Sequence, residues 1–133
     1  MTAIFAQIEV AVADHLTAAL PMRGIIVPVR NAVPRTGRPP SYVLVTRPGG
    51  GQRNLATDGP RLVVEVVAES GADAGSLAAI VRALLRAAAP GYVGEVWIDR
   101  TRDVGLAFSP DPDTNAPRYL LTVEVWQRGA ALA

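Results

Sequence analysis

Apolar residues recur about every four positions near the start of the chain. The stripe consists of Ile4, Phe5, Ile8, Val12, Leu16 and Leu20. This spacing predicts a helix that buries one face. Thr2 is a suitable N-cap. Pro21 should end the helix, because proline lacks an amide hydrogen and clashes with the preceding turn.

A second and clearer helical pattern covers residues 70–89. Its apolar stripe consists of Leu77, Ile80, Val81, Leu84, Leu85 and Ala88. Ser70 can cap the helix, with Asp73 three residues further on, in a variant of the capping box. Pro90 and Gly91 follow the stripe and predict its end.

Short runs of apolar and β-branched residues predict the strands. The runs cover residues 24–29 (centred on 25–27), 42–46, 61–67, 93–99, 104–108 and 119–126. Pro28 cannot donate to a strand ladder, so the first strand should lie at a sheet edge or stop there. In the last strand Leu121, Val123 and Val125 alternate with Leu120, Thr122 and Glu124, so they point to the opposite face.

The order of elements predicts the fold class. Strands joined by short turns favour antiparallel pairing, so we expect an α+β fold with two helices packed on one mostly antiparallel sheet. A chain of 133 residues has the size of one domain, and no linker or internal repeat divides it. We therefore expect a single domain over residues 1–133.

Composition excludes several kinds of chemistry. The chain has no Cys and a single His, His15, which excludes a disulfide scaffold, a thiolate metal site, a cysteine nucleophile and a His-clustered zinc site. Asp14 and His15 are neighbours on the first predicted helix and point about 100° apart, so we interpret them as a surface pair. We expect no enzyme, no metal and no cofactor.

Two further motifs resemble binding sites only superficially. Asp111 and Asp113 lack the glycine and the distal glutamate of a calcium loop, so we interpret them as a solvated turn. Gly49, Gly50 and Gly51 are not followed by a helical pattern, so we interpret them as a flexible hairpin tip instead of a phosphate loop.

No segment is predicted to enter a membrane. The apolar stretch over residues 3–20 contains Glu9, Asp14 and His15 and lacks a basic region before it. We expect the protein to stay in the cytoplasm in which it is made.

Charge is segregated along the chain. Residues 15–57 contain six arginines and no acid, whereas residues 58–133 contain seven arginines and ten acids. The arginine block can bind nucleic-acid phosphates, form one charged face of a protein contact, or simply keep exposed loops soluble. Only Tyr42 supplies an aromatic ring within the block, which disfavours a stacking platform for nucleic acid. Opposite charges on two sides of one subunit allow head-to-tail association, which gives a ring if it closes.

The order and spacing of these segments resemble the small tail terminator proteins of long-tailed (siphovirus-type) phages, especially those of actinobacterial hosts. The supporting segments, which together span most of the chain, are residues 47–50 (RPGG), 59–66 (GPRLVVEV), 72–88 and 117–125 (PRYLLTVEV). None of them is catalytic. Val67 departs from the pattern, because such chains often carry Trp at that position.

The resemblance implies a structural virion protein with an α+β fold. Such proteins form a ring, expected to be a homohexamer, on the head-proximal end of the tail tube. The ring ends tube polymerisation and forms the joint to the head connector or stopper protein. DNA passes through the lumen without sequence readout. The implied location is the virion tail at the head–tail joint, and the host cytoplasm during assembly.

We assign the intersubunit or tube contacts to Arg35, Arg38, Arg47 and Arg53, on the loop over residues 30–41 and around the glycine tip.

Two alternative functions remain open. The chain can be another neck or tail-completion protein of the head–tail joint, or a basic nucleic-acid-binding accessory domain. A small enzyme is a third and weaker reading, which a pocket with convergent polar groups would support.

Overall fold

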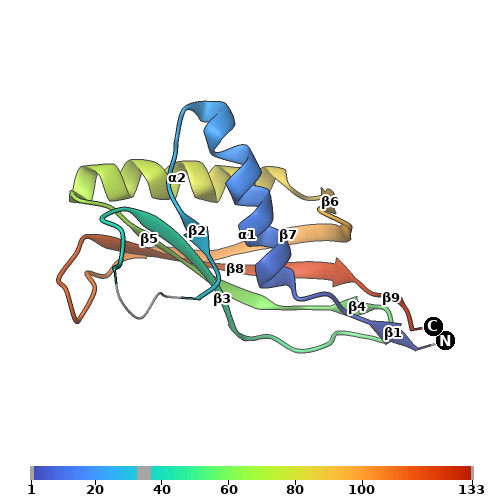
Figure 1. Cartoon of the computed structure of the whole chain (residues 1–133). Coiled ribbons are helices and arrows are strands. Elements are labelled where there is room, and N and C mark those ends of the chain that lie inside the picture. The colour runs from blue at the N-terminus through green and yellow to red at the C-terminus, as the bar shows by residue number, and fades with distance from the viewer. Residues whose placement is uncertain (1, 33–36, 133) are drawn as a thin grey trace.

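The computed structural model describes residues 2–32 and 37–132 of the chain. Figure 1 shows two helices lying on one side of a long sheet. The helices are α1 (Ile8–Ala19) and α2 (Gly71–Ala87), and a 3-10 helix, η1 (Pro21–Arg23), follows α1. The strands are β1 (Ala3–Ile4), β2 (Val29–Arg30), β3 (Tyr42–Gly49), β4 (Thr57–Asp58), β5 (Arg61–Val67), β6 (Gly91–Val93), β7 (Val96–Phe108), β8 (Arg118–Arg128) and β9 (Ala130–Ala131).

The main sheet has the strand order β2-β3-β5-β8-β7-β6, with β4 paired to β8. Strands β2 and β3 run parallel, and the other strand pairs of this sheet that the structure describes are antiparallel. The predicted α+β class, with two helices on a mostly antiparallel sheet, is therefore confirmed. The parallel pair at β2 makes the sheet mixed.

One hydrophobic core lies between the helices and the sheet. Its most buried members include Ile8 and Leu16 of α1, Val81 of α2, and the sheet residues Val43, Val45, Val64, Val66, Ile98 and Leu121. Burying one such side chain contributes about 1.5–3 kcal/mol. Leu121, Val123 and Val125 are all buried on this face, as the alternation in the last strand predicts.

Apolar side chains cover one end of the opposite face of the sheet. There Tyr42, Leu44 and Val67 form a small second cluster with Ala116. Towards the other end of β8, the side chains of Glu124 and Trp126 are only half-buried. In the part of the chain that the structure describes, both helices lie on the other side, so this region of the sheet faces outward (Figure 1).

The predicted second helix and the strand at 61–67 are confirmed. Ser70 is the N-cap of α2, and its hydroxyl accepts a hydrogen bond of 3.1 Å from the amide of Asp73. Helix α2 ends at Ala87, just before Pro90. These elements are governed by local signals, which the sequence carries directly.

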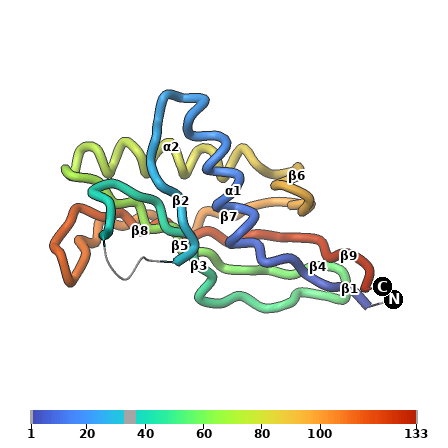
Figure 2. Tube along the Cα trace, in the orientation of Figure 1, coloured from blue at the N-terminus to red at the C-terminus, as the bar shows by residue number. Residues whose placement is uncertain are grey.

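The predicted start of the first helix is wrong. Ala3 and Ile4 form β1, which pairs antiparallel with β9, and α1 begins at Ile8. The amide of Leu132 also donates to the carbonyl of Thr2 over 2.8 Å, so Thr2 belongs to this pairing and is not a cap. Figure 2 shows the first and last segments of the described chain running side by side. This pairing joins segments far apart in sequence, which helical periodicity cannot detect.

Three strand boundaries also differ from the prediction. Residues 25–27 are not in a strand, and β2 instead begins at Val29, after Pro28, at the edge of the sheet. Strand β3 continues through Pro48 to Gly49 with a register shift after Thr46. The predicted strands at 93–99 and 104–108 are mostly one strand, β7, which continues through residues 100–103 with two register shifts against β8.

Neither described helix, in residues 2–32 or 37–132, has the length and apolar character of a membrane span.

Candidate interaction surface

Three of the four arginines assigned to contacts lie in the described residues, and each of them has an acidic partner within the chain. Arg35 lies outside the described residues. Nη1 of Arg38 lies 3.4 Å from Oδ2 of Asp111, and the Arg38 side chain is 37% exposed. The ion pair is therefore at the surface, where it contributes little to stability and leaves donors free.

Asp111 itself is buried, which corrects the interpretation of this segment as a solvated turn. Its carboxylate accepts hydrogen bonds from the amides of Asp113 (2.8 Å) and Thr114 (3.2 Å). These amides, the former above all, and the charge of Arg38 hold the pKa of Asp111 below its ordinary value. The carboxylate thus fixes the loop between β7 and β8 and positions Arg38.

Arg47 fixes the glycine segment at the end of β3. Its Nη1 and Nη2 lie 2.9 and 3.3 Å from the two carboxylate oxygens of Asp58, which is buried. Its guanidinium also donates to the carbonyls of Gly49 and Gly50 at 3.2 and 3.1 Å. A guanidinium with this many partners within its own chain has few donors left for a neighbouring molecule.

Arg53 reaches from the loop after the glycines to the outward face of the sheet. Its guanidinium lies 4.1 Å from the centroid of the Trp126 ring and 3.4 Å from the carboxylate of Glu124. Arg100 of β7 also lies over the Trp126 ring, again at 4.1 Å. Both contacts are cation–π interactions.

Glu124 is the centre of this cluster. It accepts from Arg61 of β5 at 2.6 Å and from Arg102 of β7 at 3.1 and 3.3 Å. The hydrogen bonds from Arg102 and then from Arg61 lower the pKa of Glu124 to about 2. We call Arg53, Arg61, Arg100 and Arg102, together with Glu124 and Trp126, the arginine patch.

Sequence reasoning found only Arg53 of these six residues. The others alternate along three strands, and the register brings Arg61 and Arg102 opposite Glu124, and Arg100 opposite Trp126. The alternation in β8 was visible in the sequence. The arginines that lie opposite Glu124 and Trp126 cannot be predicted from the sequence, because their places depend on which strands pair and on the two bulges in β7.

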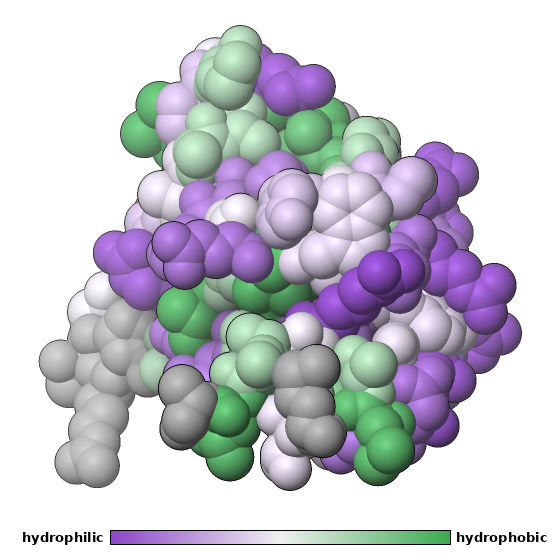
Figure 3. Space-filling model, turned by 90° about the vertical axis from the view of Figure 1, so that its right-hand side faces the viewer, coloured by the Kyte–Doolittle hydropathy of each residue, from purple (hydrophilic) through white to green (hydrophobic). Residues whose placement is uncertain are grey.

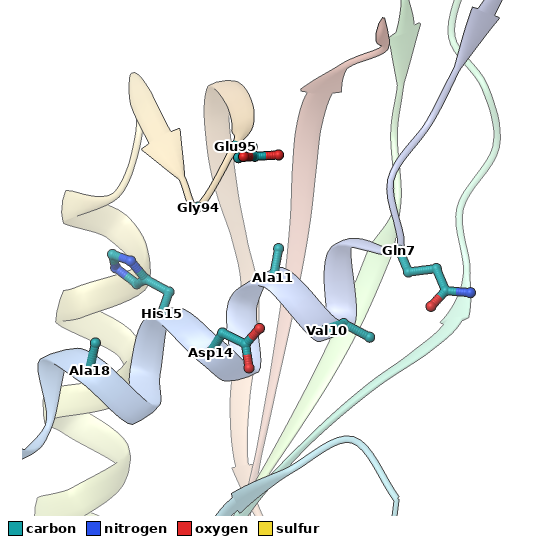
Figure 4. Close-up of a pocket in the computed structure, with 8 residues that line it drawn as sticks. All are labelled: Gln7, Val10, Ala11, Asp14, His15, Ala18, Gly94 and Glu95. Carbon is teal, nitrogen blue, oxygen red and sulfur yellow. The ribbon is translucent and has the colours of Figure 1, made fainter. Parts of the chain in front are cut away.

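A groove of about 640 Å³ lies on the other side of the molecule, between α1 and the turn from β6 to β7. Its lining is drawn in Figure 4: Gln7, Val10, Ala11, Asp14, His15, Ala18, Gly94 and Glu95. The side chains of Asp14 and His15 point in different directions there, as expected for helix neighbours. Asp14 and Glu95 make no ion pair with a described residue.

The groove is open and its lining surface is mainly apolar, with Asp14 and Glu95 as its two acids. Within residues 2–32 and 37–132, no three His, Cys, Asp or Glu side chains come together as possible metal ligands. The side chains of Asp14 and His15 point in different directions, so these two polar groups do not converge on one point of the groove.

The end of the molecule that carries the termini exposes apolar side chains. Ile4, Leu55 and Leu132 are 54, 82 and 59% exposed, and they lie on or beside the segments that pair there. Figure 3 views this side, with hydrophobic residues along its lower edge. Three of the eight large apolar side chains that are exposed among the described residues thus lie at this end.

Comparison with known proteins shows the fold. No protein-family model matches the chain, and no curated protein matches it. Among solved structures, the chain is similar to one in the virion of a native gene transfer agent particle. The TM-score is 0.66 and the sequence identity 19%, and the match covers 91% of this chain and 94% of that chain. At this identity, the likeness establishes a shared fold over nearly the whole length of both chains.

Proposed function

We propose that the chain is a structural virion protein that caps the head-proximal end of a phage tail tube as a homo-oligomeric ring. The ring ends tube polymerisation and forms the joint to the head connector or stopper protein, and DNA passes through its lumen. Its place is the head–tail joint of the virion, and the host cytoplasm during assembly.

The shared fold carries this proposal. A chain of the gene transfer agent virion matches nearly the whole of this chain, so the likeness is not limited to one helix or hairpin. The segments that resemble tail terminators, among them residues 59–66 and 117–125, form β5 and most of β8 at the centre of the sheet. Two independent signs thus support a virion protein.

The distribution of charge supports head-to-tail association. Arg38 and Arg53, the described arginines of the contact loops that keep exposed side chains, lie beside the sheet, whereas Asp14 of α1 and Glu95 of the β6–β7 turn line the groove. Neither of these two acids forms an ion pair with a described residue. A basic side and an acidic side on one subunit favour a heterologous contact, which closes into a ring at a suitable rotation.

Contacts to neighbours or to the tube are assigned to Arg35, Arg38, Arg47 and Arg53. Among the described three, Arg38 and Arg53 have side chains that are 37 and 38% exposed, and each makes one long ion pair. Arg47 is less exposed, at 28%, and is held by Asp58. Substituting Arg47 would therefore disturb the subunit itself, so the test uses Arg38 and Arg53.

The proposal is tested by polymerising the tail tube protein encoded with this chain, with and without the purified chain. We expect the wild-type protein to bind one end of the tubes and to stop their growth. The variant Arg38→Glu/Arg53→Glu should lose ring formation and tube capping. Its new carboxylates would face the acidic residues that we expect on the neighbouring subunit, so the contact would become repulsive.

The matched control is Arg23→Glu/Arg86→Glu, which makes the same charge change at two exposed arginines outside these loops. It should cap tubes like the wild type. If the Arg38/Arg53 variant still forms rings and tubes keep their normal length, the assignment of these two residues is wrong. If the wild-type chain has no effect on tube growth and binds the head connector alone, it is a neck protein of another joint.

A further inference from the structure

We propose that the arginine patch binds the phosphate backbone of duplex DNA without reading its bases. This inference rests on the proposed function for its setting, a joint through which DNA passes. The binding itself is a property of the isolated chain and can be measured without tubes. The surface that meets the DNA is the outward face of the sheet around Glu124 and Trp126.

The patch carries more positive than negative charge. Arg61, Arg100 and Arg102 project from strands on either side of β8, and Arg53 joins them from the loop before β4. Glu124 is the one carboxylate among them and is shared by three of the four guanidiniums. The patch therefore keeps three net positive charges.

Glu124 orients the guanidiniums without using up their donors. Arg61 gives it one hydrogen bond, through Nη2, and Arg102 gives it two, through Nε and Nη2. A guanidinium has five N–H donors, so both arginines keep free N–H groups. Arginine forks match phosphate oxygens well, and such bonds are among the strongest hydrogen bonds in proteins.

Trp126 favours backbone contact over base stacking. The guanidiniums of Arg53 and Arg100 both lie 4.1 Å from the ring centroid, so they occupy the ring surface on which a base would stack. The indole instead holds two long side chains in place, which lowers the entropy cost of ordering them on a ligand. Contacts limited to phosphates carry no sequence information.

The composition of the patch favours DNA over a protein partner. Arginine and tryptophan are common in protein interfaces too, but Asp and Glu are depleted there. Here the centre is a carboxylate and its arginines, and the strongly exposed Ile4, Leu55 and Leu132 are not part of the patch. A regularly spaced polyanion complements this charge pattern best.

The test titrates the full chain into two labelled duplexes of equal length and unrelated sequence, at several salt concentrations. Three net charges predict a slope of log K against log salt of about −2.7 for each contacting subunit, or roughly a 40-fold loss of affinity between 50 and 200 mM salt. Both duplexes should bind equally. The variant Arg100→Gln/Arg102→Gln should bind more weakly, with a slope of about −0.9.

Arg53 stays unchanged in this test because the proposed function assigns it to a contact. The control, Arg23→Gln/Arg86→Gln, removes the same charge from exposed positions outside the patch and should keep the wild-type slope. Circular dichroism and a urea midpoint show whether each variant is folded. A second readout, tube capping, keeps this inference separate from the proposed function.

Three results of the binding measurements alone would overturn the inference: no duplex binding by the wild type, equal losses in patch and control variants, or affinity that differs between the two duplexes. It would also fail if the patch variant binds DNA normally but no longer caps tubes, since the patch would then be a protein contact. Loss of DNA binding with normal capping supports the inference and leaves the proposed function intact.

Discussion

Gly50 shows how one residue sets the position of the loop that carries Arg53. Its φ is +92°, a region that side chains rarely adopt. A Cβ at this position would lie against the backbone of Gly59, Pro60 and Arg61. The close approach of these two backbone segments therefore requires glycine, and the carbonyl of Gly50 accepts a hydrogen bond from Arg47 there.

Gly50→Ala should destabilise the protein by about 1–3 kcal/mol, because both the dihedral and the missing space oppose a methyl group. Gly51→Ala is the matched control, since nothing lies within 4 Å of its added Cβ and its φ is not positive. It should change stability by less than about 0.5 kcal/mol. Urea unfolding of both variants measures the difference. Equal stability of the two variants would show that the backbone at Gly50 is not packed against residues 59–61.

At the scale of elements, Glu124 joins three strands. It lies on β8 and accepts hydrogen bonds from Arg61 on β5 and Arg102 on β7. A second ion pair, between Arg82 and Asp103, connects α2 to β7. The outward face of the sheet thus carries the ion pairs around Glu124, whereas the pair of Arg82 and Asp103 lies on the side of the helices, beside the apolar core.

The pKa of Glu124 predicts how this cluster responds to acid. The pKa is lowered from 4.5 to about 2, so the charged form is favoured in the folded state. Its contribution to stability is therefore complete above pH 4.5 and is lost as the pH falls through about 2. The difference in unfolding free energy between wild type and Glu124→Gln should shrink over this range.

Urea unfolding at pH 6, 4, 3 and 2.5 measures that difference. Glu69→Gln reports the effect of removing an exposed carboxylate that has no ion pair to a described residue. A difference between wild type and Glu124→Gln that stays constant, or that grows on acidification, would show that the arginines do not hold Glu124 charged.

The elements that sequence predicts well are those governed by local signals. Helix α2 has an N-cap, a continuous apolar stripe and a terminating proline, and the alternation along β8 correctly assigns its buried face. Strands β1 and β9 escape prediction because each is stable only through the other. The bulges of β7 escape it for the same reason, since a bulge is defined against a partner strand.

The contact residues assigned from the sequence stay a prediction, and the arginine block contains only one member of the arginine patch, Arg53. The block also places Arg47 among the contact residues although Asp58 holds it within the subunit. The block also omits Arg61, Arg100 and Arg102, because they lie in residues 58–133, where ten acids outnumber seven arginines. Only the register of β5, β7 and β8 gathers them around one carboxylate.

At the scale of the whole molecule, three surfaces lie on different sides of one core. The arginine patch occupies the outward face of the sheet, the groove with Asp14 and Glu95 borders α1, and exposed apolar side chains gather where the termini meet. The proposed capping ring would need such surfaces for its contacts with neighbouring subunits and with the tail tube.

The most direct test of a capping ring is to image tail tubes mixed with the purified chain by electron microscopy, together with the mass of the bound assembly. The account predicts a closed ring of identical subunits at one end of each tube and none along its length. A single unassociated subunit in every condition, or subunits distributed along the tube, would contradict it.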